Sequence, residues 1–319
     1  MKKTLLFLFL FTCFILAQEK TDPADTSFAL FSTMVKVYKD YHNAKLVVPE
    51  IPECVVEEKN LIYTSYGKRE MHLDLYLPQQ KSTNVSQHLF PIVIMIHGGG
   101  WRSGYREMEK PMALFLASEG FICATVEYRL SGEAKYPASV IDIQKAIKWL
   151  KDQYKKYNID IKEIALYGCS SGGQIAALLG TNNWGHKSDI GNVHAVIDID
   201  GVLDMTDSNE SGKDKDPSNA SSGKRWFGYS YVEKPDLWKE GSAINYINGN
   251  SASYCFINSS LPRFHAGRDS VINQLDRNKI YSEIHTIANT PHTFWLFHPW
   301  FEETGNHIVT FLDKIFQSR

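Results

Sequence analysis

Two adjacent serines stand between glycines at residues 166–173, in the stretch LYGCSSGG. The pattern glycine-x-serine-x-glycine fits one register there, Gly168, Ser170 and Gly172, because a register on Ser171 would need a glycine where a cysteine stands. A sharp turn between a strand and a helix holds such a serine clear of the strand and exposes its hydroxyl. The pattern therefore predicts that Ser170 is a nucleophile for acyl transfer.

A second glycine-rich motif, HGGGW, occupies residues 97–101 and directly follows the apolar run PIVIMI. Consecutive glycines leave their backbone N–H groups uncovered, and acyl transfer needs such donors for the negative oxygen of its tetrahedral intermediate. We assign this oxyanion hole to Gly99 and Gly100, together with the N–H of Ser171 at the start of the following helix. His97 is expected to support the loop by hydrogen bonds rather than to react.

Strands and helices alternate along the rest of the chain. Apolar runs predict strands, and amphipathic stretches between them predict helices, one of which ends at Gly120. Such alternation indicates an α/β protein with a doubly wound, mostly parallel sheet. An antiparallel hairpin over residues 61–78 precedes the sheet. The predicted strands are 91–96, 121–128, 163–168, 194–201, 253–258 and 281–289, and the predicted helices are 108–120, 137–157, 174–180 and 307–316.

HGGGW some seventy residues before GCSSG, with VEYRLSGEAKYPASVIDIQKAIKWL between them, resembles the α/β-hydrolase superfamily. The likeness is to its acetyl-esterase and lipase branch, which is feruloyl-esterase-like, and the chain also resembles secreted carbohydrate esterases of bacterial type. It covers residues 58–317 or so and implies one α/β-hydrolase domain, 58–319, without a large cap domain. It does not explain two segments, an N-terminal extension, 18–57, and a polar insertion loop, 203–224. The sequence does not tell whether the insertion loop acts as a lid.

The resemblance also implies a base and an acid that follow the serine along the chain. His292 lies in NTPHTFWLF, after a predicted strand and before the last helix, where the family keeps its base; His298 is the alternative. Asp269, in FHAGRDSVI, follows the strand SYCFIN and precedes His292 by 23 residues, as the family arrangement requires. Asp200 is expected instead to close a strand and shape the floor of the pocket.

Aromatic side chains surround these motifs, above all in PHTFWLFHPWF. Their faces could provide a stacking platform for a sugar or an aromatic acyl group. We name Trp101, Trp295 and Trp300 as candidate substrate-binding residues, against the alternative that these rings belong to the core.

The N-terminus begins with a basic MKK and continues as an almost unbroken apolar run to Ala17. This pattern predicts a secretory signal peptide, 1–17, and a secreted or periplasmic protein. A lipoprotein anchor would use Cys13, which follows the rather bulky Thr12. The run is shorter than the roughly 20 residues of a membrane span.

The composition limits the classes of molecule that this protein is expected to bind. The net charge of −2 offers no basic surface for nucleic acid. No metal-ligand spacing or dinucleotide fingerprint is present, so the sequence predicts neither a metal nor a cofactor. We expect an exported serine esterase that removes acetyl or similar groups from plant polysaccharide, oligosaccharide or another glycoside. The alternatives are a carboxylesterase or lipase for small esters and an inactive binding module; the oligomeric state and the pairing of the cysteines stay open.

Overall fold

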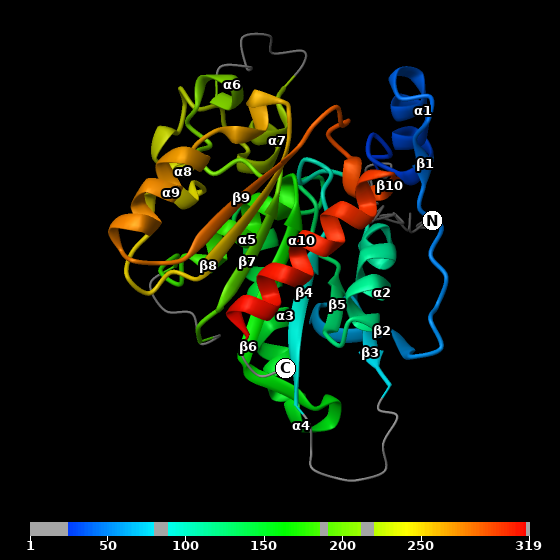
Figure 1. Cartoon of the computed structure of the whole chain (residues 1–319). Helices are drawn as coiled ribbons and strands as arrows, with labels where there is room; N and C mark the ends of the chain where they lie inside the picture. The colour runs from blue at the N-terminus through cyan, green and yellow to red at the C-terminus, as the bar shows by residue number, and fades with distance from the viewer. Residues whose placement is uncertain (1–24, 80–88, 186–190, 212–219, 317–319) are drawn as a thin grey trace, which may run out of the picture.

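The computed structural model describes residues 25–79, 89–185, 191–211 and 220–316. Its centre is an eight-stranded sheet with strand order β2-β3-β5-β4-β6-β7-β8-β9 (Figure 1). The strands of this sheet are β2 (Val55–Tyr66), β3 (Arg69–Pro78), β4 (Phe90–Ile96), β5 (Ile122–Val126), β6 (Ile159–Cys169), β7 (Ala195–Ile199), β8 (Ser253–Ser259) and β9 (Ser282–Ile287).

The predicted doubly wound sheet with an antiparallel start is confirmed. β2 pairs antiparallel with β3, and β3 antiparallel with β5, whereas every pair from β5 to β9 is parallel. β4 lies between β5 and β6, so the chain leaves it in one direction and later returns on its other side. The carboxyl ends of β4 and β6 therefore meet at a topological switch point, where open α/β sheets bind their ligands.

Helices cover both faces of the sheet, with α2 and α10 on one face and α3 and α5 on the other (Figure 1). Both faces of the central strands are buried, which explains their continuous apolar sequences. Among the described residues no helix is long and apolar enough to cross a membrane. The helices and short 3-10 turns are α1 (Leu30–Asp40), η1 (Arg106–Glu109), α2 (Lys110–Ser118), α3 (Ala138–Asp152), α4 (Tyr154–Tyr157), α5 (Ser171–Gly180), α6 (Ser208–Ser211), α7 (Ser222–Phe227), α8 (Pro235–Glu240), η2 (Ala243–Asn245), η3 (Pro262–His265), α9 (Arg268–Arg277), η4 (Phe294–Leu296) and α10 (Trp300–Ile315).

The described part of the N-terminal extension, from residue 25 on, is fixed to the domain. Lys45 and Leu46 form β1 (Lys45–Leu46), which pairs with β10 (Phe297–His298) in a second, two-stranded sheet. Asp25 contacts Arg102, with 3.3 Å between Oδ2 and Nε, and so links the extension to the loop after β4. β2 begins at Val55, so the sheet starts within the predicted extension. The predicted signal peptide, 1–17, lies outside the described residues.

The predicted insertion loop, 203–224, leads from β7 into short helices above the carboxyl edge of the sheet (Figure 1). Residues 212–219 of it lie outside the described part of the chain. Ser222, at its end, lies against Gly100: a side chain on Gly100 would begin 2.9 Å from the Ser222 hydroxyl oxygen. This end of the insertion therefore borders the glycine loop.

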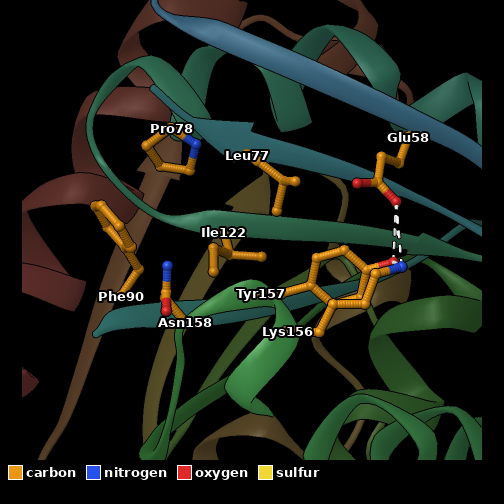
Figure 2. A pocket seen from close by; sticks show the side chains of 8 residues that line it. All are labelled: Glu58, Leu77, Pro78, Phe90, Ile122, Lys156, Tyr157 and Asn158. Carbon is orange, nitrogen blue, oxygen red and sulfur yellow. Dashed lines mark hydrogen bonds and ion pairs between the residues drawn. The ribbon is translucent and has the colours of Figure 1, made fainter. Parts of the chain in front are cut away.

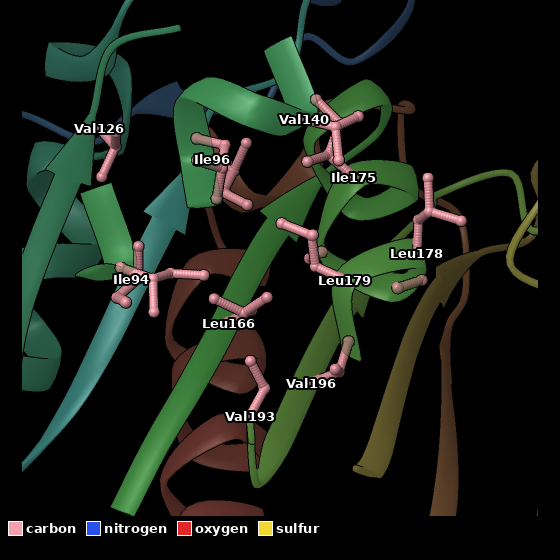
Figure 3. Close-up of a cluster of buried hydrophobic side chains, with 14 of the residues drawn as sticks. Ile94, Ile96, Val126, Val140, Leu166, Ile175, Leu178, Leu179, Val193 and Val196 are labelled. Carbon is pink, nitrogen blue, oxygen red and sulfur yellow. The ribbon is translucent and has the colours of Figure 1, made fainter. Parts of the chain in front are cut away.

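β6 carries the serine turn, and its central side chains anchor it in the core. Leu166 is fully buried and lies among Ile94, Val196 and Leu179 from both neighbouring strands and α5 (Figure 3). Close packing of this kind leaves little room to collapse around a lost side chain.

Leu166→Ala should therefore lower the free energy of unfolding by about 2–5 kcal/mol, since it removes buried methyl groups and leaves a cavity. Ile161→Ala is the control on the same strand; Ile161 is 41% exposed, and its loss should cost less than about 1 kcal/mol. Urea unfolding followed by circular dichroism measures both. Equal losses would contradict the account of β6 as an anchored core strand.

Candidate active site

Ser170 occupies a strained turn between β6 and α5. Its φ of 53° and ψ of −116° lie outside the regions that residues other than glycine commonly adopt. Gly168 and Gly172 make the turn possible, because a Cβ on either would overlap backbone atoms, those of Gly172 and of Ile96 respectively. The motif thus selects glycine for close backbone approach, and its register exposes Ser170 as the sequence predicted.

His292 joins Ser170 to a carboxylate. Its Nε2 lies 2.9 Å from the Ser170 hydroxyl oxygen, and its Nδ1 lies 3.0 Å from Oδ2 of Asp200. The sequence therefore predicted the serine and the histidine that the fold brings together. His298, the alternative base, instead contacts Glu302 at 2.7 Å.

The structure does not place Asp269 beside His292. Asp269 stands in the first turn of α9, its side chain is 77% exposed, and it pairs with the neighbouring Arg268 at 2.8 Å. Asp200 takes the place beside His292 because it follows β7, the strand next to β6. Cys169 and Ile199 are register partners, so the residues that follow them, Ser170 and Asp200, emerge side by side.

Asp200 is fully buried and well supplied with donors. Its Oδ1 accepts the backbone N–H of Ser259 at 2.9 Å and the Asn258 amide at 3.3 Å, and its Oδ2 accepts the Ser259 hydroxyl at 2.6 Å. Hydrogen bonds of this kind stabilise a buried carboxylate. In the sequence, the only sign of Asp200 was its position at the end of the alternating segment VIDIDG. To place it beside His292, one would have had to know that this strand is the neighbour of β6.

The glycine loop lies beside Ser170 because β4 and β6 are parallel neighbours, with Ile96 opposite Gly168. A side chain on Gly98 would begin 3.5 Å from Ser170 Cβ and 3.6 Å from the Phe28 ring. His97 is buried; its Nδ1 lies 2.8 Å from the Gly98 carbonyl oxygen, and its ring stacks on Tyr128. Burial lowers the pKa of His97 to about 4, so this histidine supports the loop as a neutral ring, as predicted.

The predicted aromatic platform is not formed by the tryptophans. Trp101 is only 5% exposed, stacks on Trp226 and donates to Gln174, and Trp295 is only 1% exposed. Trp300 packs edge-on against Tyr41. The structure therefore places Trp101 and Trp295 in the core, whereas Trp300 is only partly buried.

Two phenylalanines that the sequence analysis did not select lie at the site instead. Phe264 stacks flat on the His292 ring, with 3.6 Å between centroids and 4° between planes. Phe28, from the N-terminal extension, lies by Gly98 and Ser170. Neither has a local sequence signal, because their positions depend on how η3 and the extension fold back over the sheet.

The surface pockets found in the described residues lie away from the serine turn. One, lined by residues such as Phe90, Ile122 and Asn158, lies at the amino ends of β4, β5 and β6 (Figure 2). The serine turn lies at the opposite, carboxyl edge of these strands, the edge that binds ligands in folds of this kind.

Comparisons with known proteins identify the family of this chain. Residues 73–276, more than half of the chain, match the BD-FAE family, and the chain belongs to that family of α/β hydrolases. Esterase LipC of Mycobacterium tuberculosis is 27% identical over 200 residues, 57% of this chain and 45% of that protein. An arylesterase of Saccharolobus solfataricus is 30% identical over 135 residues, 42% of each chain. The chain thus spans less than half the length of these relatives.

Solved structures share the fold at lower identity. A truncated carbohydrate esterase from gut microbiota has a TM-score of 0.68 at 23% identity, covering 86% of this chain and 99% of that one. An inhibited esterase B from Lactobacillus rhamnosis has a TM-score of 0.70 at 20% identity, covering 90% of this chain and 94% of that one.

A buried carboxyl group lies directly behind the serine turn. Oε2 of Glu109 accepts from Tyr167 at 3.1 Å and from the Cys169 thiol at 3.7 Å. Burial raises the pKa of Glu109 to about 8, and burial together with Asp200 raises the pKa of Asp198 to about 7. At pH 7 the folded protein keeps most of the proton on Glu109 and about half of the proton on Asp198, whereas both groups are ionised in the unfolded chain.

Stability should therefore fall as pH rises, because the unfolded state binds fewer protons. Between pH 7 and 8 the slope reports mainly on Glu109, since Asp198, with its pKa of about 7, is already about half ionised at pH 7. We expect the free energy of unfolding to drop there by about 1 kcal/mol. Glu109→Gln, whose amide oxygen can still accept both bonds, should remove most of the drop and leave the smaller part that comes from Asp198.

Urea unfolding at pH 7.0, 7.5 and 8.0 measures this effect. Glu107→Gln is the matched control, because the Glu107 side chain is 48% exposed and should leave the slope unchanged. An identical slope in parent and Glu109→Gln would show that Glu109 is already ionised at pH 7.

Proposed function

We propose that this protein is a serine esterase, which hydrolyses carboxylic esters through an acyl-enzyme. The observation that carries the proposal is the chain of contacts from Ser170 through His292 to Asp200. A hydroxyl needs a base to become nucleophilic, and the base needs a partner that fixes its tautomer. The esterase relatives support the same chemistry.

In this mechanism the Ser170 oxygen attacks the ester carbonyl while His292 Nε2 takes its proton. Asp200 holds Nδ1–H and stabilises the imidazolium without taking the proton itself. The intermediate's oxyanion is bound by backbone N–H groups of Gly99, Gly100 and Ser171. His292 then protonates the departing alcohol, and water attacks the acyl-enzyme in the same way to release the acid.

We further propose an acylated saccharide as the substrate, with acetyl or a similar group removed. Support comes from the BD-FAE family and from fold neighbours described as a carbohydrate esterase and an acetyl ester-xyloside bifunctional hydrolase. The signal-like residues 1–17 support export, which suits a polymeric substrate. A carboxylesterase for small esters remains the second candidate, favoured by the esterase B neighbours.

Ser170→Ala should reduce turnover of 4-nitrophenyl acetate and acetate release from acetylated xylan or pectin by at least about 10⁴-fold. Ser171→Ala should remain active, because it keeps its backbone N–H and does not remove the nucleophile. Undiminished turnover in Ser170→Ala would refute the mechanism. Activity on 4-nitrophenyl esters but on neither polysaccharide would support the small-ester alternative.

Asp200→Asn and Asp269→Asn separate the two candidate acids. The first should lower kcat by about 10⁴-fold, because an amide beside Nδ1 favours the wrong tautomer of His292. The second should stay within about twofold of the parent, since Asp269 faces solvent. The reverse order in steady-state kinetics would restore Asp269 as the acid.

A further inference from the structure

Three side chains able to bind a metal meet on the face of the sheet that α10 covers. Cys255 on β8 is the register partner of Glu283 on β9, and His285 follows two residues later on the same face. Cys255 Sγ lies 3.8 Å from Oε1 of Glu283, and His285 Nε2 lies 3.0 Å from the same oxygen. The atoms that could bind a metal, the Cys255 sulfur, a Glu283 carboxylate oxygen and a His285 ring nitrogen, all lie within 4.8 Å of one another.

These polar groups stand where the fold would ordinarily place apolar ones. Ile287, next on the same face of β9, is buried in the core beneath α10, and so is Cys255. Glu283 and His285 have side chains only 18% and 27% exposed. Charged groups at such positions cost free energy unless they are paired or bind a metal.

Surrounding groups orient the three residues. The His307 ring, on α10, stacks on His285 with 3.8 Å between centroids. Tyr281 donates a hydrogen bond to Oε2 of Glu283, and Lys314 donates to the Tyr281 hydroxyl at 2.6 Å. Metal ligands in proteins are typically held by an outer set of partners of this kind.

We propose that Cys255, Glu283 and His285 bind a Zn²⁺ ion. One sulfur, one nitrogen and one oxygen ligand suit this borderline ion, and three protein ligands leave a fourth position for water. Tetrahedral coordination at about 2.1–2.3 Å sets ligand atoms about 3.5 Å apart, so the present cluster needs to tighten by about 1 Å at its widest.

Binding releases one proton to solvent, from the Cys255 thiol. The ion would tie the edge strand β9 to β8. Cys255 stands 28 residues before Glu283. The ligands therefore form no short motif from which the sequence alone could predict the site.

The test uses the full chain after treatment with a chelator, titrated with Co²⁺ and then with Zn²⁺. We expect one equivalent of Co²⁺ to produce a thiolate-to-metal charge-transfer band and tetrahedral d–d bands, which Zn²⁺ then displaces. Cys255→Ser should abolish the charge-transfer band, and His285→Gln should weaken Co²⁺ binding at least about tenfold. Zn²⁺ should also raise the melting temperature of the parent but not of the two variants.

Cys54→Ser is the matched control for binding at another thiol and should keep both the band and the affinity. His285→Gln lies at a half-buried position, so it tests the proposal even if Cys255→Ser does not fold. No charge-transfer band in the parent, or a band that persists in Cys255→Ser and an affinity unchanged in His285→Gln, would overturn the proposal.

Discussion

The parallel register of β4, β6 and β7 is the constraint on which the site depends. Because Ile96 lies opposite Gly168 and Cys169 opposite Ile199, three successive strands in space end at one level of the sheet. The glycine loop, the serine turn and Asp200 each begin one or two residues beyond that level. Hydrogen bonds between strands, rather than side-chain contacts, set their relative heights.

The extent of burial distinguishes residues of the same type that lie near the site. Asp200 and Asp269 are both carboxylates near strand ends, yet one is fully enclosed by donors and the other faces solvent. Only the enclosed group can hold an imidazole ring in one orientation, because a solvated side chain remains free to rotate. The same contrast separates Trp101 and Trp295, used in the core, from Phe264, which lies flat on His292.

Two segments outside the sheet, the N-terminal extension and the insertion after β7, also contribute residues near Ser170. Phe28 reaches the glycine loop from the first described turn of the chain, and Ser222 borders the loop from the other direction. Both segments approach Gly98 and Gly100, whose lack of side chains lets other parts of the chain come close. Variation in these two segments can alter the surroundings of Ser170 without altering the sheet.

The sequence by itself determined the alternation of strands and helices, the register of the serine motif, the glycine loop and the choice of His292. The first three rest on local patterns, such as glycines that permit close backbone approach or apolar runs that predict buried strands, whereas the choice of His292 rests on the family resemblance. The tertiary structure alone decided that Asp200 replaces Asp269 and that Phe28 and Phe264 lie at the site. It also decided that Cys255 meets Glu283 and His285. These contacts depend on which strands are neighbours in space, and strand order is not written in any local stretch of the chain.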